Sequence, residues 1–401
     1  MRMHKHLLAL LLAVTCHPSI VAKPAHDMPI IAFFGVPDWR TADEHFQTFS
    51  ECGFTVSQYP YPSLDLLVKA CRIADKYNVK VLGRCPEMVS SPTKAANTLK
   101  QEKGFFGYFM QDEPTAPEIA LRKQEIDRLR RTDTTHVFYI NLFPYYHASW
   151  IEPSLKVKTY PEYLKAASAT NCGQLSFDHY PVTTAGIRPT WYHNLEMIRR
   201  ECLSSRKPFW GFVLSVPHEV PFTPDTYYPQ PTMGSLRLQV YVNLAYGAQA
   251  IQYFTYWTPT PKNYNYHDAP IGLDGRKTKT YWLVQQMNRE LKAVAPLFYG
   301  ARVRSVHHLG TIPEGTTRLT TMPANLRALK VVGRQGAVVA QLEKDGHRYL
   351  AIVNKSHEQP LTVRIRPANA TPRHLTKQLQ EEKMKTSYSV EAGDLLLFRL
   401  T

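Results

Sequence analysis

Three segments of the sequence place a carboxylate at the end of a run of apolar and aromatic residues or within a few residues of it. Asp112 and Glu113 follow one such run, Asp178 follows another, and Glu219 follows a third. Two carboxyl groups that face each other can act as a protonated acid and an ionised base or nucleophile. The sequence therefore offers Glu113, Asp178 and Glu219 as candidate catalytic residues.

The Asp112-Glu113 pair is the strongest of these signals. Acidic residues often favour the start of a helix, but the next segment, Thr115-Ala116-Pro117-Glu118, already has the pattern of a capping box with proline in the first turn. The pair is thus not needed for capping. Because the run before it, 105–110, is rich in aromatic residues, we expect desolvation to raise the pKa of Glu113 and keep it protonated as a general acid.

The roles of the other two carboxylates are less defined by sequence. Asp178 could hold a sugar hydroxyl, hold the nucleophile, act as a base, or simply cap a loop by accepting backbone hydrogen bonds. Glu219 lies in a proline-rich stretch, where it is either a functional group or an ordinary surface glutamate.

Aromatic residues are concentrated in the same segments, and this combination suits a carbohydrate. Sugar C–H faces stack on aromatic rings while carboxylates and amides bind hydroxyls. No phosphate-binding glycine loop, HExxH motif, GxSxG elbow or dinucleotide fingerprint is present, so neither a cofactor nor a metal is expected. The candidate substrate-binding residues are Asp112, Tyr180, His218, Trp257, Tyr256, Tyr61 and Trp39.

These residues follow eight short apolar runs, most of which are followed by a segment with helical periodicity. Continuous apolar strands indicate a parallel sheet buried on both faces, and eight such units in about 270 residues predict a (β/α)8 TIM barrel over residues 28–298. The active site of such a barrel lies at the C-terminal ends of its strands. The predicted strands are 30–36, 54–59, 79–84, 105–111, 136–142, 173–178, 208–214 and 250–257.

The pattern changes after Pro296. Six short strands separated by turn signals, with no helices between them, predict a small antiparallel β-sandwich over residues 301–401. This part is basic, with Arg364 and Arg366 two residues apart and Lys383 and Lys385 at the same spacing. The surplus is either scattered solubilising charge or a surface that attracts an anionic glycan or the cell envelope.

The whole chain has a formal net charge of +15, which raises nucleic acid as a partner. There is no arginine-rich arm, Cys/His module or basic-aromatic RNA motif, and this argues against nucleic acid.

Residues 1–22 have the pattern of a secretory signal peptide. Arg2 and Lys5 precede a short apolar run and small residues that end at Ala22. We expect an exported, periplasmic or extracellular protein with no transmembrane segment; Cys16 is a poor match to a lipoprotein site. The other cysteines show no CxxC or zinc spacing and read as small buried hydrophobes.

The chain resembles the clan A retaining glycoside hydrolases, in particular secreted bacterial proteins of β-galactosidase-like type. The resemblance rests on Asp112-Glu113-Pro114, Phe177-Asp178-His179-Tyr180-Pro181 and the segment 245–257, Ala-Tyr-Gly-Ala-Gln followed by Tyr-Phe-Thr-Tyr-Trp. It implies that Glu113 is the acid/base and that Asp178 and Tyr180 contact the sugar. The seventh strand departs from the clan, because Phe212-Val213-Leu214-Ser215 has no nucleophilic glutamate at its end.

Two functions therefore remain open from sequence. One is a glycosidase in which Glu113 protonates the leaving oxygen while Glu219 or Asp178 supplies the nucleophile or positions water. The other is a glycan-binding barrel without catalytic activity. The distance from Glu113 to a second carboxylate separates the two.

Overall fold

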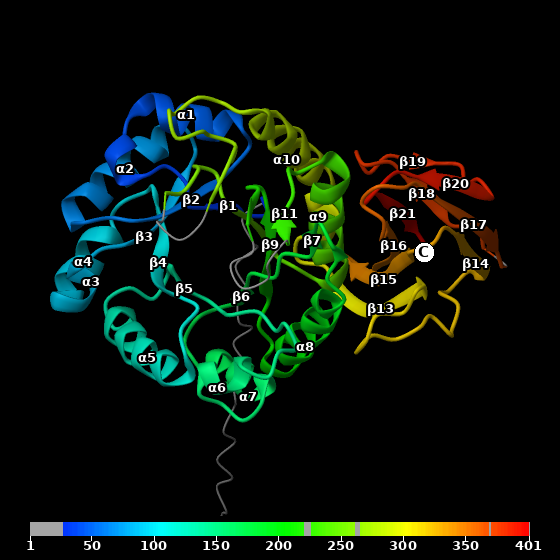
Figure 1. The fold of residues 1–401 in the computed structure, drawn as a ribbon, viewed down its shortest axis with the longest axis horizontal. Coiled ribbons are helices and arrows are strands. Elements are labelled where there is room, and N and C mark those ends of the chain that lie inside the picture. The colour runs from blue at the N-terminus through cyan, green and yellow to red at the C-terminus, as the bar shows by residue number, and fades with distance from the viewer. Residues whose placement is uncertain (1–26, 220–225, 261–264, 369, 401) are drawn as a thin grey trace, which may run out of the picture.

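The computed structural model of the protein describes residues 27–219, 226–260, 265–368 and 370–400. The segment 1–22, predicted to be a signal peptide, lies outside these residues, and so does Cys16. Figure 1 shows a barrel surrounded by helices and, beside it, a smaller all-β unit formed by the last quarter of the chain.

The eight predicted strands are all present and form one parallel sheet in the order β5-β4-β3-β2-β1-β12-β9-β6. A parallel bridge between Leu142 and Phe177 joins the two edge strands, and Leu142 N donates to the carbonyl of Ser176 at 2.8 Å. The sheet therefore closes on itself, and the predicted (β/α)8 barrel is confirmed. The strands are β1 (Ile30–Phe33), β2 (Val56–Pro60), β3 (Lys80–Arg84), β4 (Phe105–Asp112), β5 (Val137–Asn141), β6 (Leu175–Phe177), β9 (Phe209–Leu214) and β12 (Ala250–Phe254).

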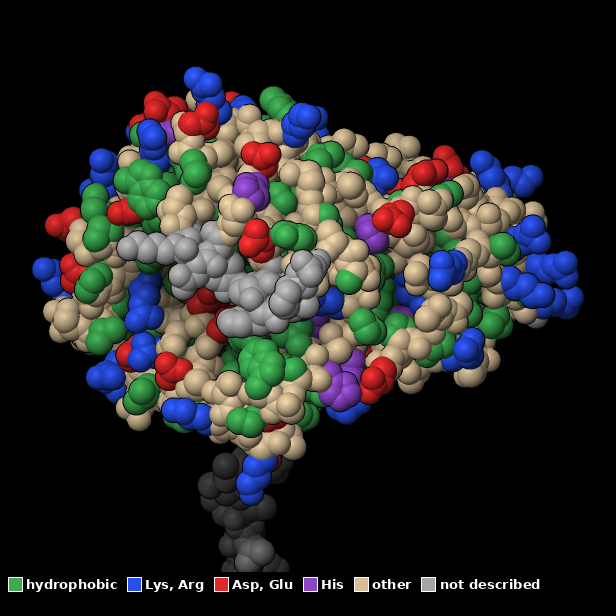
Figure 2. Space-filling model, viewed as in Figure 1, with side chains coloured by type: hydrophobic (Ala, Val, Ile, Leu, Met, Phe, Trp, Pro, Cys, Tyr) green, Lys and Arg blue, Asp and Glu red, His purple; other side chains and the backbone are tan. Residues whose placement is uncertain are grey.

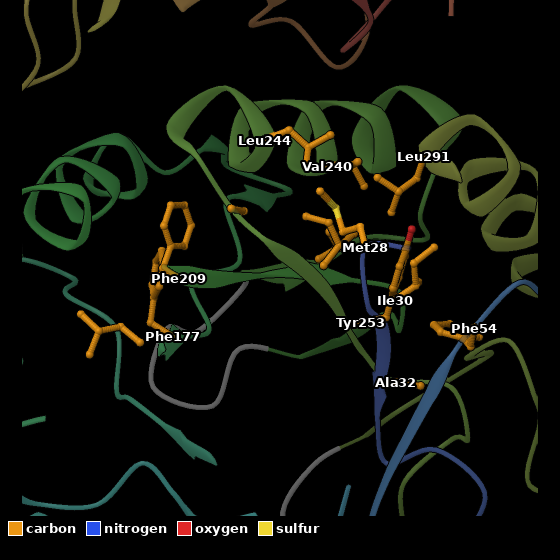
Figure 3. Packing of buried hydrophobic residues seen from close by; sticks show 14 of the residues in the cluster. Met28, Ile30, Ala32, Phe54, Phe177, Phe209, Val240, Leu244, Tyr253 and Leu291 are labelled. Atoms are coloured by element: carbon orange, nitrogen blue, oxygen red, sulfur yellow. The ribbon is translucent and has the colours of Figure 1, made fainter. Parts of the chain in front are cut away.

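Helices cover the outside of the barrel and bury its outward-facing side chains. Figure 3 shows Val240 and Leu244 of α9 packed over Ile30 of β1 and Tyr253 of β12. The helices are α1 (Asp43–Glu51), α2 (Leu64–Lys76), α3 (Glu87–Ser90), α4 (Pro92–Leu99), α5 (Ala116–Arg130), α6 (Ile151–Leu155), α7 (Tyr160–Ser168), α8 (Thr190–Ser205), α9 (Met233–Tyr246) and α10 (Lys279–Phe298), with a short 3-10 turn, η1 (Asp38–Arg40).

Two short hairpins lie at the C-terminal ends of the barrel strands. The pair β7 (Val182–Thr183) and β8 (Gly186–Ile187) follows β6, and the pair β10 (His218–Glu219) and β11 (Tyr227–Tyr228) follows β9. The carbonyl of Tyr227 accepts from Thr184 N at 2.9 Å, so the two hairpins support each other at the mouth of the barrel.

The C-terminal unit is antiparallel, as predicted, and its two sheets pack face to face around their own apolar core. The six predicted strands are present; three short ones, β18, β19 and β20, escaped prediction because they are brief and rich in polar residues. The larger sheet holds β13 (Arg302–Gly310), β15 (Gly336–Lys344), β16 (His347–Asn354), β21 (Leu395–Arg399), β18 (Arg373–Leu375) and β19 (Glu381–Glu382), and the smaller holds β14 (Leu326–Val332), β17 (Leu361–Pro367) and β20 (Ser387–Val390).

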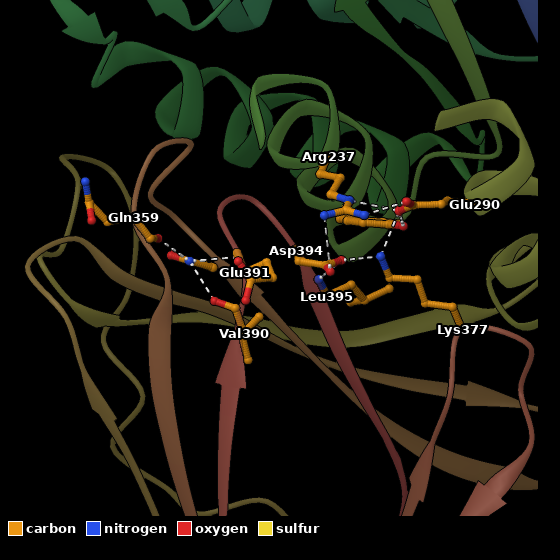
Figure 4. A network of polar contacts seen from close by, with 10 residues as sticks. Arg237, Glu290, Gln359, Lys377, Val390, Glu391, Asp394 and Leu395 are labelled. Carbon is orange, nitrogen blue, oxygen red and sulfur yellow. Dashed lines mark hydrogen bonds and ion pairs between the residues drawn. The ribbon is translucent and has the colours of Figure 1, made fainter. Parts of the chain in front are cut away.

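An ion-pair network ties the C-terminal unit to the barrel (Figure 4). Glu290 of α10 accepts from Arg237 of α9 at 2.5 Å and from Lys377 at 2.7 Å, and Lys377 also contacts Asp394 at 2.8 Å. All four side chains are largely buried, so solvent screens the network little. Helix α9 lies between barrel and sandwich, and for this reason it is apolar on nearly every side.

The described cysteines are free thiols, and four of the five are buried as predicted, while Cys202 is half-buried. No helix in the described part of the chain has the length and apolarity that crossing a bilayer requires.

Candidate active site

The predicted carboxylates meet at the C-terminal ends of strands β4, β5 and β6. Figure 2 looks onto this face of the barrel and shows acidic side chains recessed in its middle. We call Asp112, Glu113 and Asp178 the carboxylate cluster. The sequence identified all three residues, and the structure brings them together.

The backbone at Glu113 explains how two consecutive carboxylates can serve one site. Successive side chains of a strand point to opposite faces, so Asp112 and Glu113 would separate if β4 simply continued. Glu113 instead has a φ of 43°, in the left-handed region that non-glycine residues seldom occupy, and its N–H donates to the carbonyl of Asn141 at 2.9 Å. This turn lets both carboxylates act on Asp178.

Asn141, at the end of β5, holds the cluster together. Its Nδ2 donates to Oδ1 of Asp112 at 3.0 Å and to Oδ1 of Asp178 at 2.8 Å. Its own oxygen accepts from Ser176 Oγ at 2.9 Å. One amide thus bridges two carboxylates, and both of its N–H groups are used.

The hydrogen bonds behind Asn141 fix its orientation. Because the hydroxyl proton of Ser176 goes to the amide oxygen, Ser176 Oγ must accept from both Gln252 Nε2 at 2.8 Å and the hydroxyl of Tyr139 at 3.1 Å. Ser176, Gln252 and Tyr139 are fully buried inside the barrel. The amide therefore cannot turn its oxygen toward the carboxylates without breaking this network.

The surroundings raise the pKa of every carboxyl group in the cluster. Solvent reaches Asp112 and Glu113, but protein surrounds them on most sides, and this desolvation together with the negative charge of Asp112 raises the pKa of Glu113 to about 8. Desolvation raises the pKa of Asp112 to about 6, against the hydrogen bond from Asn141. Desolvation and the charges of Glu113 and Asp112 raise the pKa of Asp178 well above its usual range.

The expectation about helix capping is confirmed. Glu118 closes the capping box of α5, where its Oε2 accepts from Thr115 N at 2.7 Å. Asp112 and Glu113 take no part in it.

The aromatic surroundings of Glu113 differ from the expectation. The run 105–110 packs in the barrel wall, where Tyr108 stacks on Phe138, rather than around the carboxyl group. The tyrosines that interact with Glu113 come from later segments: Tyr146, Tyr160, Tyr163 and Tyr180.

A pocket of about 270 Å³ lies across the mouth, where β1, β2 and β12 end. We call it the aromatic pocket and define it by Phe34, Trp39, Tyr59, Trp257, Thr258 and Tyr266. Two of the predicted substrate-binding residues, Trp39 and Trp257, are among them. Trp39 is 63% exposed and its ring lies 5.8 Å from that of Tyr59.

Tyr180 and His218 lie between the two regions. The ring of Tyr180 is 5.7 Å from Phe254, and His218 is 6.2 Å from the same ring and 4.6 Å from Tyr228. Burial lowers the pKa of His218 to about 4, and its Nδ1 donates to the carbonyl of Val216. His218 is therefore neutral at pH 7 and contributes a flat surface rather than a charge.

Three predicted residues fall elsewhere. Tyr256 is 1% exposed and packs against Phe49 and Phe54 between the barrel and α1, so it cannot contact a ligand in the mouth. Tyr61 is 3% exposed and lies beneath Tyr59. These two assignments are corrected: both residues follow a strand, but their side chains point away from the mouth.

Glu219 is the third predicted residue that lies outside the site. It is exposed on the β10–β11 hairpin, and within the described ranges no hydrogen bond or ion pair connects it with the carboxylate cluster. The structure brings Asp178, and not Glu219, to Glu113.

Asn141, Ser176 and Gln252 were missed by sequence reasoning. The available signal was a polar residue within or at the end of an otherwise apolar strand, which in a barrel points inward or toward the mouth.

In the described residues no group of three His, Cys, Asp or Glu side chains is arranged to hold a metal ion.

Comparison with known proteins shows which family and which solved structures the chain is similar to. The family model described as Beta-galactosidase matches residues 115–294. A catalytic mutant of a GH42 β-galactosidase from G. stearothermophilus superposes with a TM-score of 0.64 at 9% identity, covering 94% of this chain and 98% of that one. The resemblance to the clan A (β/α)8 glycoside hydrolases is confirmed, whereas the Asp112-Glu113-Pro114 motif lies before the residues that the family model matches.

Two more clan A β-galactosidases match. The enzyme from Bacillus circulans sp. alkalophilus gives a TM-score of 0.60 at 10% identity, covering 92% of this chain and 98% of that one. The enzyme from the psychrophilic Marinomonas ef1 gives 0.48 at 11%, covering 67% of this chain, which spans 60% of that enzyme's length. Comparison with curated protein sequences gives no match.

Proposed function

We propose that this protein hydrolyses an O-glycosidic bond of a glycan, with Glu113 as the general acid. The observation that carries the proposal is the meeting of Glu113 with Asp178 and Asp112 at the mouth of the barrel. A carboxyl group whose pKa is raised to about 8 is protonated at neutral pH and can donate its proton to the leaving oxygen.

Asp178 is the proposed partner of Glu113. Burial and the charge of Asp112 raise the pKa of Glu113, and the interaction with Asp178 lowers it, so the two carboxyl groups lie close together. An inverting enzyme needs about 6.5–9.5 Å between its carboxyl groups to admit a water, whereas a retaining enzyme needs about 5–5.5 Å. The contact favours retention.

In the proposed reaction Asp178 attacks the anomeric carbon while Glu113 protonates the leaving oxygen. The bond from the anomeric carbon to that oxygen breaks, and a glycosyl ester forms on Asp178. Glu113, now ionised, takes a proton from water, which attacks the ester and regenerates Asp178. Asp178 must be ionised to attack, and the hydrogen bond from Asn141 favours that form against the burial and the charges of Glu113 and Asp112, which raise its pKa.

The first substrates to test are β-galactosides, because the matching family is described as β-galactosidase and the similar structures named above carry that activity in their descriptions.

The nucleophile is tested with Asp178→Asn and, as matched comparison, Glu219→Gln, assayed with a 2,4-dinitrophenyl β-galactoside and sodium azide. We expect azide to restore turnover of the Asp178 variant and to yield a glycosyl azide, since the small anion fills the space of the lost carboxylate. The Glu219 variant should keep wild-type activity. Rescue of the Glu219 variant instead, with glycosyl azide formed, would assign the nucleophile to the β10–β11 hairpin.

A glycan-binding barrel is the second candidate, and the end of β9 favours it. The clan's nucleophile position follows Leu214, where this chain has Ser215, and Ser215 Oγ donates to the carbonyl of Thr255 at 2.7 Å. Binding of an oligosaccharide with no product released over a day would support this function.

We also propose that the protein is exported, on the signal-peptide pattern of residues 1–22. N-terminal sequencing of the protein from the periplasm or medium should find a start near Lys23; an intact N-terminus on cytosolic protein would contradict export.

A further proposal concerns the C-terminal unit, whose smaller sheet carries a basic face. Lys330 of β14 lies directly opposite Arg364 of β17, and Arg366 follows on the same exposed side. Figure 2 shows Lys and Arg side chains gathered at the end of this unit. Like charges opposite each other destabilise a sheet, and in the described part of the chain no carboxylate pairs with these three residues. We propose that the basic face attracts an anionic glycan or the envelope surface.

Retention of the full chain on immobilised heparin tests this proposal. Arg364→Ala with Arg366→Ala should elute at lower salt than the wild type, because screening shortens the Debye length from about 10 Å at 0.1 M to about 3 Å at 1 M. The control, Arg128→Ala with Arg131→Ala on the α5 side, removes the same charge. Equal retention of both variants would contradict a specific role for the basic face.

A further inference from the structure

The aromatic pocket is separate from the carboxylate cluster but connected to it by a row of rings. Tyr180, two residues after Asp178, lies 5.7 Å from Phe254, and Phe254 lies 5.9 Å from Phe34, which lines the pocket. Phe34 is in turn 6.2 Å from Tyr59. A row of ring contacts therefore runs from the buried Tyr180, beside the carboxylate cluster, to Tyr59 in the aromatic pocket.

The lining of the aromatic pocket has the composition of a sugar site. Flat apolar faces come from Trp39, Tyr59 and Trp257, and a hydroxyl group comes from Tyr59. The hydroxyl of Thr258 is already used, because it donates to the carbonyl of Ile271 and accepts from Ala269 N. The half-buried carboxylate of Asp38 lies close enough to Tyr59 to raise the pKa of its hydroxyl, together with burial. Sugar C–H faces stack on such rings, while hydroxyls bind the few polar groups.

The size and exposure of the pocket fit one sugar unit rather than a large ligand. Its volume of about 270 Å³ lies just below the 300–1,000 Å³ typical of sites for drug-sized molecules. Trp39 exposes 63% of its surface on the short η1 turn. A large indole left uncovered beside a concave pocket gains most when a flat apolar surface covers it.

We propose that the aromatic pocket is a distal subsite that binds a second sugar unit of the same chain whose bond is cleaved at the carboxylate cluster. The proposal rests on the proposed glycosidase function and adds to it that the substrate is an oligosaccharide rather than a simple glycoside. The row of ring contacts from Tyr180 to Phe34 links the two regions on one side of the barrel mouth.

The test compares Trp39→Ala with wild type on a ladder of β-galacto-oligosaccharides and on 4-nitrophenyl β-galactoside. The wild-type kcat/KM should rise with chain length, and Trp39→Ala should lose this rise, about tenfold on the longest substrate, through KM. On the nitrophenyl substrate, which carries a single sugar unit, the variant should lose far less than on the longest oligosaccharide. Trp39→Phe should recover most of the loss, since its ring restores stacking.

The control is Trp282→Ala on the outer helix α10, where the indole is 56% exposed and is not among the residues that line the aromatic pocket. It should follow wild type on every substrate. Equal kcat/KM for wild type and Trp39→Ala across the ladder would overturn the subsite while leaving the glycosidase intact.

If the protein hydrolyses neither substrate, a binding measurement tests the subsite. Calorimetric titration of the full chain carrying Glu113→Gln with the longest oligosaccharide should give an affinity about tenfold higher than the same chain that also carries Trp39→Ala. Equal affinity, or no binding by either, would overturn the subsite.

Discussion

Asn141 donates a hydrogen bond of 2.8 Å to Asp178 at the place where the barrel closes. Asn141 ends β5 and Asp178 follows β6, and these are the two edge strands of the sheet, joined by a bridge between the neighbouring residues Leu142 and Phe177. The two strands whose pairing closes the barrel thus also carry the hydrogen bond that positions Asp178. A substitution that removes this hydrogen bond should therefore affect both the stability of the barrel and its catalytic activity.

Replacing Asn141 with alanine tests this link. The variant leaves Asp112 and Asp178 without their shared donor, so the pKa of each should rise further, and the acidic limb of the pH profile of kcat/KM should move to higher pH. We expect about 1–3 kcal/mol lower stability as well. The exposed Asn97→Ala on α4 should change neither property. A loss of stability with an unmoved pH profile would make Asn141 purely structural.

Glu113 should make the protein less stable as the pH rises. Its pKa in the folded state, about 8, lies above the value near 4.3 expected when unfolded. Between these values the folded state binds the extra proton, so stability falls as the pH increases through this window. Glu113→Gln removes the ionisation.

The melting temperature of Glu113→Gln relative to wild type should therefore increase from pH 5 to pH 9, on the order of 1–3 °C once the effect is reduced for the solvent that reaches Glu113, measured by calorimetry. The same comparison with the exposed Glu44→Gln should show no trend. A difference independent of pH would mean that Glu113 is not desolvated in solution.

Glu290 should behave in the opposite way. Burial raises its pKa, but hydrogen bonds from Arg237 and Lys377 outweigh this effect and lower the pKa to about 2. A lowered folded pKa gives stability that is present above about pH 4.4 and is lost as the pH falls toward 2. Glu290→Gln should therefore cost about 2–4 kcal/mol at pH 7 and much less at pH 3, in urea unfolding at both pH values. An equal loss in the free energy of unfolding at both pH values would show that the charge of Glu290 is not the source of the stabilisation.

The sequence predicted the barrel well because each of its strands is a continuous apolar run, and such runs are specific to a sheet covered on both faces. It also identified Asp112, Glu113 and Asp178, since the end of a strand is a fixed position in this fold. The direction of a side chain after the strand is not fixed in this way. Tyr61 and Tyr256 follow strands as Trp39 does, yet both turn into the core.

The bridging role of Asn141 could not be read from the sequence, because it depends on which strands become neighbours when the sheet closes. The left-handed turn at Glu113 was equally hidden, since it is a property of the backbone and not of the residue type. Both features decide whether the carboxylates meet.

The central claim is that Glu113 donates the proton to the leaving group, and its dependence on leaving-group acidity tests this most directly. Wild type and Glu113→Gln are assayed on a β-galactoside disaccharide and on 2,4-dinitrophenyl β-galactoside. We predict that the variant loses about 10²–10⁴-fold in kcat/KM on the disaccharide and far less on the dinitrophenyl substrate, whose leaving group needs no proton. Wild-type turnover of the disaccharide by Glu113→Gln would contradict the account.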